Sequence, residues 1–276
     1  MNKWIIALFV LFTAACAPEQ PLTSAQFSVD SSIINGTPVT ERRTRAAQSV
    51  VLLEALDHRN RIIGLCSGTL ISEGAFLTAA HCLDPMAMPT LRSFNLVFTE
   101  DYTPGKAFVR RAGVRAYLHP RYNSSGTHDH DIAVGFFAGG IPSRYYWVRF
   151  DTNQRADYSG KTVYVYGYGR TVDWTVDETA EMGRLHRGLM KIDDSYLRQA
   201  DRYRTSTASE SYICHGDSGG PQFYHENGVL KIIGVNSATI VSKHGPKKTC
   251  LGLAQATKVA AASDWILRIL KLNRAL

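Results

Sequence analysis

The sequence predicts an all-β protein that ends in one α-helix. Short apolar runs separated by polar turns recur along the chain, at residues 50–53, 61–65, 76–78, 162–166 and 229–233. Strands at this spacing favour a β-barrel or a β-sandwich. Residues 33–276 are enough for one globular unit or for two closely packed barrels.

The predicted helix lies near the end of the chain. Ser263 is suited to cap its first turn, because a serine hydroxyl can accept a hydrogen bond from a free backbone N–H. The apolar residues that follow recur at helical spacing and form one face: Trp265, Ile266, Ile269 and Leu270. We therefore expect a terminal helix that begins at Ser263.

Residues 1–15 predict export from the cytoplasm. A short basic start precedes an apolar run from Trp4 to Ala15, which is shorter than the roughly 20 residues that span a bilayer. This pattern is typical of a signal peptide. The small residues before Cys16 resemble a bacterial lipoprotein signal, so we expect a lipid on Cys16 and a location in the cell envelope. The alternative is an ordinary secretory signal, cut after Ala15 or Ala17.

Residues 16–32 predict a tether or propeptide. They are rich in proline, serine and other polar residues, so they cannot bury much apolar surface. We expect the membrane to be reached only through the lipid on Cys16.

Three motifs supply the parts of a serine hydrolase. Residues 214–221 read Cys-His-Gly-Asp-Ser-Gly-Gly-Pro, residues 77–82 read Leu-Thr-Ala-Ala-His-Cys, and residues 131–134 read Asp-Ile-Ala-Val. A serine hydroxyl is a weak nucleophile until an imidazole takes its proton, and a buried carboxylate must orient that imidazole. We assign these roles to Ser218, His81 and Asp131.

The glycines beside Ser218 predict an oxyanion hole. They let the N–H groups of Gly216 and Ser218 approach a developing negative charge, and each such donor is worth roughly 3–4 kcal/mol of barrier. The same residues match the Gly-x-Ser-x-Gly elbow of α/β-hydrolases. That fold places its histidine after the serine, where His225 and His244 lie in polar segments without an acid motif. The order His81, Asp131, Ser218 is that of chymotrypsin.

From about Ile33 to its end the chain resembles trypsin/chymotrypsin-like serine proteases. The matching segments occur in family order, at residues 33–36, 66–72, 77–82, 131–134, 166–169, 214–221, 233–237 and 257–259. The resemblance implies two packed six-stranded antiparallel β-barrels, residues 33–148 and 149–276, with a C-terminal helix. His81 and Asp131 would lie on the first barrel and Ser218 on the second, with the active site in the cleft between them.

The resemblance also pairs the cysteines. It implies the disulfides Cys66–Cys82 and Cys214–Cys250, each worth ~3–4 kcal/mol in the chain-entropy model, and leaves Cys16 over. Paired cysteines indicate an oxidising compartment outside the cytoplasm.

A further implication is activation by proteolysis. In the family, the amino group freed at the position of Ile33 inserts beside the aspartate before the nucleophile, here Asp217. We expect cleavage between Ser32 and Ile33. Because Ser32 is not basic, the activating protease should prefer small residues, and this protein itself would qualify.

The expected specificity departs from that of trypsin. Tyr212, six residues before Ser218, stands where trypsin-like enzymes carry an aspartate. The other residues that family position assigns to the pocket are uncharged: Ser237, Thr239 and Ala254. We expect a narrow pocket for small or medium apolar side chains. The alternative is that Tyr212 points away from the pocket, since spacing does not give side-chain direction.

The net charge and the motifs of the chain indicate which kinds of binding partner to expect. The formal net charge of +7 fits either attraction to anionic surfaces or an ordinary solvated basic surface, and no nucleic-acid motif accompanies it. His128 and His130 lack further spaced ligands, so we expect no metal and no cofactor. We expect a monomer that acts on peptides or proteins. The alternative functions are a catalytically silent homologue that acts as a binding module, and an esterase with the same triad.

Overall fold

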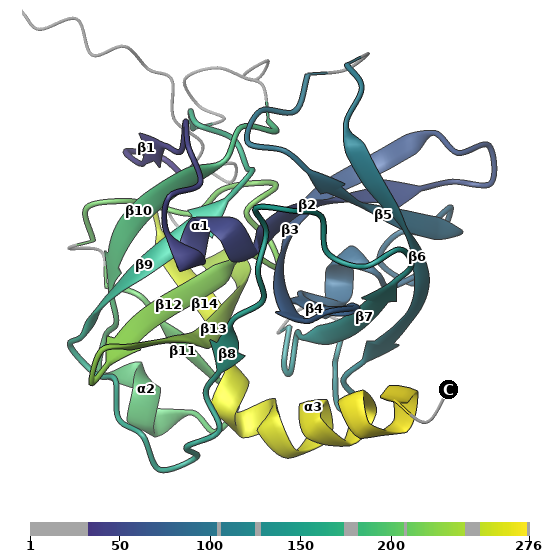
Figure 1. Cartoon of the computed structure of the whole chain (residues 1–276). Coiled ribbons are helices and arrows are strands. Elements are labelled where there is room, and N and C mark those ends of the chain that lie inside the picture. Colours follow the sequence, from purple (N-terminus) through teal and green to yellow (C-terminus); the bar gives the residue numbers. More distant parts are fainter. Residues whose placement is uncertain are drawn as a thin grey trace, which may run out of the picture.

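The computed structural model describes residues 33–103, 106–124, 128–173, 182–206, 209–240 and 249–274. Two units built of β-strands lie side by side, and the terminal helix runs beneath them (Figure 1). The predicted signal peptide (1–15), the tether (16–32) and Cys16 lie outside the described residues.

The first unit is a closed antiparallel barrel of six strands in the order β2-β3-β4-β7-β6-β5. Its strands are β2 (Val50–Leu56), β3 (Ile62–Ser72), β4 (Ala75–Thr78), β5 (Ser93–Phe98), β6 (Val109–Leu118) and β7 (Ala133–Phe137). Phenylalanine rings pack in its interior among aliphatic side chains, and the centroids of Phe76 and Phe94 lie 5.8 Å apart. Gly135 makes room for them, because a Cβ there would lie 2.3 Å from the ring of Phe76.

The second unit is an eight-stranded sheet in the order β1-β10-β9-β12-β13-β14-β11, with β8 paired to β13. Its strands are β1 (Thr37–Pro38), β8 (Arg149–Phe150), β9 (Thr162–Gly167), β10 (His186–Lys191), β11 (Arg202–Arg204), β12 (Pro221–Glu226), β13 (Val229–Ile240) and β14 (Leu253–Lys258). A bridge between Ile192 and Thr205 joins the chain just after β10 to the chain just after β11, so the sheet curls back on itself.

The predicted fold class is therefore confirmed, with two differences in the second unit. Two short strands, β1 and β8, extend it beyond six, and β8 pairs with β13 in parallel. The predicted unit 33–148 includes β1, but β1 pairs with β10 of the second sheet. A strand of two residues leaves no recognisable pattern in a sequence, since alternation needs a longer run.

The helices are short except for the last. They are α1 (Arg45–Ser49), the 3₁₀ turn η1 (Ala80–Cys82), α2 (Ser195–Arg198) and α3 (Val259–Arg274). The prediction that Ser263 caps the terminal helix is wrong, because α3 begins at Val259 and Ser263 is buried within it. Ala260–Ala262 explain the earlier start, since alanine is the strongest helix former.

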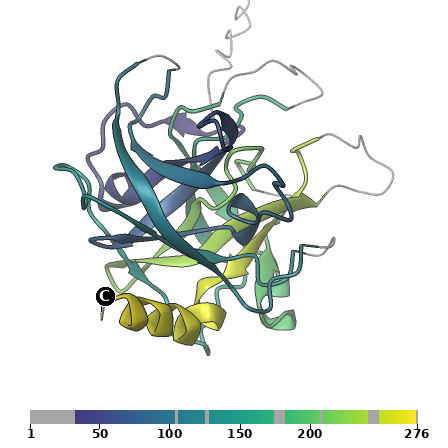
Figure 2. The ribbon, with the colours of Figure 1, turned by 90° about the vertical axis from the view of Figure 1, so that its right-hand side faces the viewer.

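Helix α3 closes the fold from below. Its apolar face buries Ala262, Ile266 and Ile269 in the same core cluster as the barrel, and Figure 2 shows the helix along one side of the molecule. No helix within the described ranges is long and apolar enough to cross a membrane.

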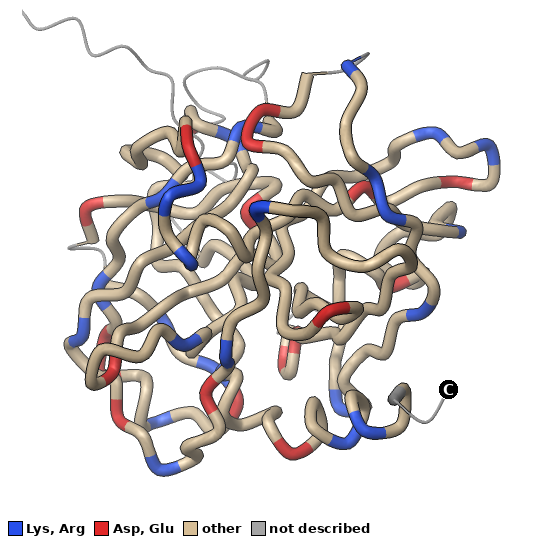
Figure 3. The backbone as a smooth tube through the Cα atoms, in the orientation of Figure 1, with Lys and Arg blue, Asp and Glu red and all other residues tan. Residues whose placement is uncertain are grey.

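The charged residues are spread over the whole fold. In Figure 3, segments with Lys or Arg and segments with Asp or Glu are interspersed over both units. In the part of the chain that the structure describes, this distribution fits an ordinary solvated surface better than a basic binding face.

Candidate active site

The first barrel brings His81 and Asp131 together. Strands β4 and β7 are antiparallel neighbours, with Thr78 opposite Ala133. His81 follows the end of β4 in η1, and Asp131 precedes the start of β7. Residues just past one strand and just before its antiparallel partner lie at the same edge, so the pairing itself places the two side chains side by side.

Asp131 holds the imidazole of His81. Its Oδ2 atom lies 2.8 Å from Nδ1 of His81, and its Oδ1 atom accepts a hydrogen bond of 3.0 Å from the backbone N–H of the same residue. An ionised carboxylate only accepts, so Nδ1 carries the proton and Nε2 keeps its lone pair. This is the tautomer that a general base requires.

The Asp131 carboxyl remains ionised although it is fully buried. Burial alone would raise its pKa, but the adjacent imidazole and its hydrogen bonds, with that of Ser237, bring the pKa below the ordinary value. The Ser237 hydroxyl donates to Oδ2 at 2.6 Å, and the Thr257 hydroxyl donates to the backbone carbonyl of Asp131 at 2.9 Å. Both residues come from the second sheet, so the acid is held from both units.

Ser218 lies in the nucleophile loop, residues 214–220, which precedes β12. The loop presses against the first barrel: the N–H of Ser67 in β3 donates to the carbonyl of Ser218 at 2.8 Å. Gly219 has φ +80°, and a Cβ there would lie 2.1 Å from Oγ1 of Thr78, so only glycine fits. His81 and Ser218 line the same cleft, which has a volume of about 400 Å³.

The nucleophile loop also orients the predicted oxyanion donors. The carbonyl of His215 accepts a hydrogen bond of 2.8 Å from the N–H of Arg170. In a trans peptide the N–H points opposite to the carbonyl, so the N–H of Gly216 is directed away from Arg170. On the other side of Gly216, its carbonyl accepts from the hydroxyl of Ser67 at 2.9 Å. Both peptides around Gly216 are therefore held in one orientation.

Asp217 is a fully buried acid that contacts Ile33. Its oxygens accept hydrogen bonds of 2.8 Å from the N–H groups of Gly169 and Cys214, and the backbone N–H of Ile33 donates as well. Burial raises the pKa of Asp217 to about 7, because these backbone donors offset only part of the lost solvation. The predicted pair Ile33 and Asp217 is thus in contact in the uncleaved chain.

The four residues predicted to line the substrate pocket make different contacts. Tyr212 pairs with Ile34 through backbone hydrogen bonds of 2.9 and 3.0 Å and packs on Cys214 and Cys250. Thr239 donates from its hydroxyl to the carbonyl of Ile213 at 3.4 Å. The hydroxyl of Ser237 donates to Asp131.

Ala254 is buried in the core of the second sheet, opposite Thr239 in the pairing of β13 with β14. Both implied disulfides are present: Cys66–Cys82 joins β3 to η1, and Cys214–Cys250 joins the nucleophile loop to the segment before β14.

The sequence did not identify Ser67 as part of the site. Its hydroxyl links Gly216 to the N–H of Tyr168, which donates to it at 3.0 Å. These contacts join residues 149 and 101 positions apart in the chain. No local pattern marks such a residue; the only signal was its place beside Cys66 in a matched segment.

Comparisons with known proteins identify the family of the chain. The family model described as Trypsin matches residues 34–266. The fibrinolytic enzyme, isozyme C, of Lumbricus rubellus is 27% identical over 223 residues, which cover 73% of this chain and 86% of the relative. Granzyme M of Homo sapiens is also 27% identical over 223 residues, covering 74% and 79%. Chymotrypsin-like elastase family member 1 of Macaca fascicularis is 27% identical over 226 residues, covering 75% and 79%.

Proposed function

Because the chain belongs to the trypsin family and is a serine-type endopeptidase, we propose that Ser218, His81 and Asp131 are its catalytic triad. The observation that carries this assignment is the 2.8 Å contact between Nδ1 of His81 and Asp131, with Ser218 in the same cleft as His81. Both disulfides fit a fold formed outside the cytoplasm.

The reaction proceeds through an acyl-enzyme. Nε2 of His81 takes the proton of the Ser218 hydroxyl as its oxygen attacks the carbonyl carbon of the peptide bond. The N–H groups of Gly216 and Ser218 donate to the oxygen of the tetrahedral intermediate. His81 then gives its proton to the leaving amine, and a water activated by the same imidazole releases the acyl group. Asp131 stabilises the imidazolium throughout.

Cleavage before Ile33 activates the enzyme. In the uncleaved chain, a neutral backbone N–H of Ile33 meets a buried carboxyl whose pKa is raised to about 7. Cleavage would turn that N–H into an ammonium and supply the missing positive charge. The pair holds the nucleophile loop through Asp217, next to both oxyanion donors. Breaking such a buried pair typically costs about 3–5 kcal/mol.

The substrate pocket accepts small or medium apolar side chains. The hydrogen bond from Thr239 to the carbonyl of Ile213 links the two segments that form the pocket walls in the family. Tyr212 brings no carboxylate to pair with a cation, so arginine and lysine would be buried unpaired. Cleavage of a peptide library, read by mass spectrometry, tests this: strong cleavage after arginine contradicts it.

The precursor is a lipoprotein of the cell envelope, anchored through Cys16. Both disulfides lie within residues 66–250, so no bridge ties the tether to the catalytic unit. Cleavage before Ile33 therefore releases the protease from the membrane. N-terminal sequencing and membrane fractionation test this: full activity in a form that begins at Cys16 contradicts the activation, and an anchored form that begins at Ile33 contradicts the release.

Ser218→Ala tests the mechanism. It should lower turnover about 10⁶-fold and abolish labelling by a fluorophosphonate, while the unfolding midpoint stays near that of the parent. Ser93→Ala, an exposed serine in β5, is the matched control and should leave both unchanged. A parent protein that the probe never labels would support the silent homologue, and a parent that hydrolyses esters but no peptides would support the esterase.

A further inference from the structure

The loop that carries Asp131 is contacted by a second aspartate, Asp201, which directly precedes β11 in the second sheet. The Oδ2 atom of Asp201 accepts a hydrogen bond of 2.9 Å from the backbone N–H of His130, the residue before Asp131. On the other side of His130, its carbonyl accepts from the N–H of Ile132 at 2.8 Å. The backbone is therefore held on both sides of His130, and Asp201 provides one of the two contacts.

His130 adopts a backbone conformation that needs such support. Its φ angle of +51° lies in the left-handed region, which is unfavourable for a residue with a side chain. Strained conformations of this kind persist where the surrounding structure restrains them, and they cluster at active sites. Because the φ angle of His130 helps to set the direction in which the chain enters Asp131, a contact that fixes His130 also fixes the position of Asp131.

Asp201 is itself anchored in the second sheet, next to another residue that contacts the loop. Its side chain is 13% exposed, and its carbonyl accepts from the N–H of Lys258 at 2.8 Å. The neighbouring residues Arg202 and Thr257 lie opposite each other in the pairing of β11 with β14. Thr257 donates from its hydroxyl to the carbonyl of Asp131 at 2.9 Å. The same end of this strand pair therefore holds the loop at two points.

The other charged groups around Asp201 do not compete for its carboxylate. Nη1 of Arg202 lies 3.9 Å from Oδ2 of Asp201, but this guanidinium makes a closer ion pair with Asp129. Nδ1 of His130 lies 4.0 Å away, and burial lowers the pKa of this imidazole below its ordinary 6.5, so the ring is uncharged at neutral pH. The hydrogen bond from the backbone N–H of His130 is the shortest of these three contacts.

We propose that Asp201 is a positioning residue for Asp131, which it holds in place by fixing the backbone of His130. The proposal rests on the proposed function of Asp131 as the acid of the triad. Without Asp201 the backbone of His130 would relax, and the carboxylate of Asp131 would move relative to Nδ1 of His81, from which it is 2.8 Å away. Asp201 is not among the described residues that line the cleft, so its loss should slow catalysis and leave substrate binding unchanged.

The first test is steady-state kinetics of the mature form, which begins at Ile33, on a peptide substrate. Asp201→Ala should lower kcat about tenfold at unchanged KM, because a small displacement of a catalytic group slows the chemical step. Asp201→Asn should restore kcat to within about twofold of the parent, since an amide oxygen can still accept from the N–H of His130. If Asp201→Ala does not fold, Asp201→Ser replaces it, because the serine side chain is too short to accept at the same distance.

The matched control is Asp194→Ala, which should leave both constants unchanged. Asp194 is an exposed aspartate that precedes α2 and makes no side-chain hydrogen bond to cap it. A parent-like kcat in Asp201→Ala, a rise in KM without a fall in kcat, or equal losses in Asp201→Ala and Asp201→Asn would overturn the proposal.

The second test does not depend on activity. The Nδ1 proton of His81 gives a low-field NMR signal when it is hydrogen-bonded to a carboxylate, and the signal is assigned by its absence in His81→Ala. In the Ser218→Ala protein, adding Asp201→Ala should shift this signal upfield and speed its exchange with water, whereas adding Asp201→Asn should preserve it. A parent that gives the signal but cleaves no peptide would count against the proposed function alone. An unchanged signal with Asp201→Ala would overturn the positioning role whatever the peptidase does.

Discussion

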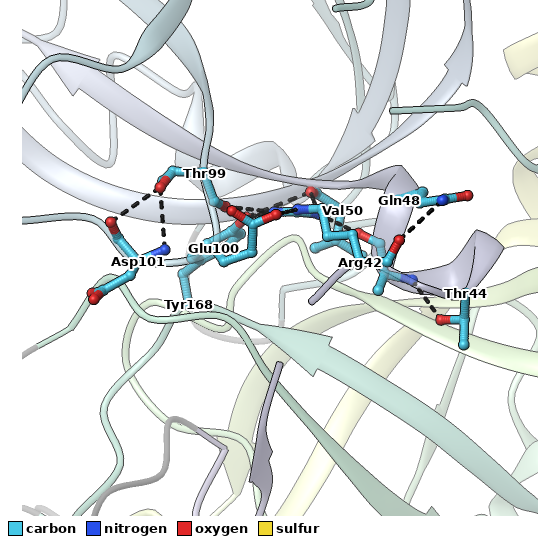
Figure 4. A network of polar contacts seen from close by, with 9 residues as sticks. Arg42, Thr44, Gln48, Val50, Thr99, Glu100, Asp101 and Tyr168 are labelled. Carbon is cyan, nitrogen blue, oxygen red and sulfur yellow. Dashed lines mark hydrogen bonds and ion pairs between the residues drawn. The ribbon is translucent and has the colours of Figure 1, made fainter. Parts of the chain in front are cut away.

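Arg42 and Asp217 are both buried charged residues, but their surroundings differ. The Arg42 side chain is 2% exposed and donates to the carbonyls of Ala47, Val50 and Thr99 and to the hydroxyl of Tyr168 (Figure 4). It also pairs with Glu100 at 3.0 Å. Asp217 accepts only from backbone N–H groups, and no ion pair to it occurs among the described residues.

This difference in contacts indicates that Arg42 has a structural role, whereas Asp217 still lacks a cationic partner. Arg42 has an anion and several acceptors in the uncleaved chain, so it joins the first barrel to Tyr168 whether or not the chain is cut. Asp217 lacks a cation, and its raised pKa of about 7 records the free energy of holding a buried charge without one. Arg42 therefore already has its counter-ion in Glu100, whereas Asp217 is buried without a cation among the described residues.

The comparison predicts that replacing Arg42 lowers the free energy of unfolding more than any other change, and by the same amount in the precursor and the mature protein. Arg42→Met should lower the free energy of unfolding by about 3–5 kcal/mol in precursor and mature protein, because it leaves several buried acceptors without a donor. Urea unfolding of both forms, in the Ser218→Ala background to prevent self-cleavage, measures this. Arg43→Met is the control: this side chain is 81% exposed, and the change should stay within about 0.5 kcal/mol. A loss of stability in only one of the two forms would contradict this prediction.

At Asp217 we predict that the stability of the precursor depends on pH between 3.8 and about 7. The folded pKa of about 7 lies above the ordinary 3.8, so the folded state keeps a proton that the unfolded state releases. The stabilisation is complete below pH 3.8 and is lost as pH rises to about 7, a difference of about 4 kcal/mol. Unfolding of the precursor and its Asp217→Asn variant at several pH values measures this, and equal pH slopes in both would contradict it.

After cleavage, the effect of the Asp217→Asn substitution on stability should change sign. The Ile33 ammonium then pairs with the carboxylate, which raises the ammonium pKa above its unfolded value of roughly 7.7–8.0. Its contribution is complete below that value and fades as pH rises through the folded pKa. Asp217→Asn should therefore destabilise the mature form near neutral pH. The same variant at pH 8 should leave the precursor as stable as its parent or more so, and destabilisation of both forms would refute the reversal.

Ser67 should have a smaller effect, on catalysis rather than folding. Ser67→Ala removes the hydroxyl that links Gly216 to Tyr168, so kcat should fall about tenfold while KM changes little. Steady-state kinetics on a peptide substrate measures this. Ser72→Ala, at the far end of the same strand, is the control. A change in KM alone would mean that Ser67 does not hold the oxyanion donors.

The smallest effect is expected at Glu100, the exposed partner of Arg42. Its side chain is 39% exposed, so water already solvates the charge. Glu100→Gln should change the free energy of unfolding by no more than about 1 kcal/mol, since the amide oxygen can still accept from Arg42. Urea unfolding checks this, and a loss as large as that of Arg42→Met would show that the ion pair, rather than the carbonyl acceptors, satisfies Arg42.

The sequence by itself determined the family, the all-β class and both disulfides. Motifs such as Gly-Asp-Ser-Gly-Gly are read locally, because the backbone requirements that select each glycine act within a few residues. The five predicted apolar runs fall in strands, except for Arg61 just before β3, for the same reason, since the apolar pattern and strand length are local properties.

Only the tertiary structure decided what distant residues do for one another. Ser237 donates to Asp131, Ser67 contacts the nucleophile loop, and His128 lies against His81. These contacts depend on strand register and side-chain direction, which spacing along the chain does not encode. The charge that Asp217 lacks could likewise not be read from its motif, because solvation and ion pairing are set by everything packed around a group.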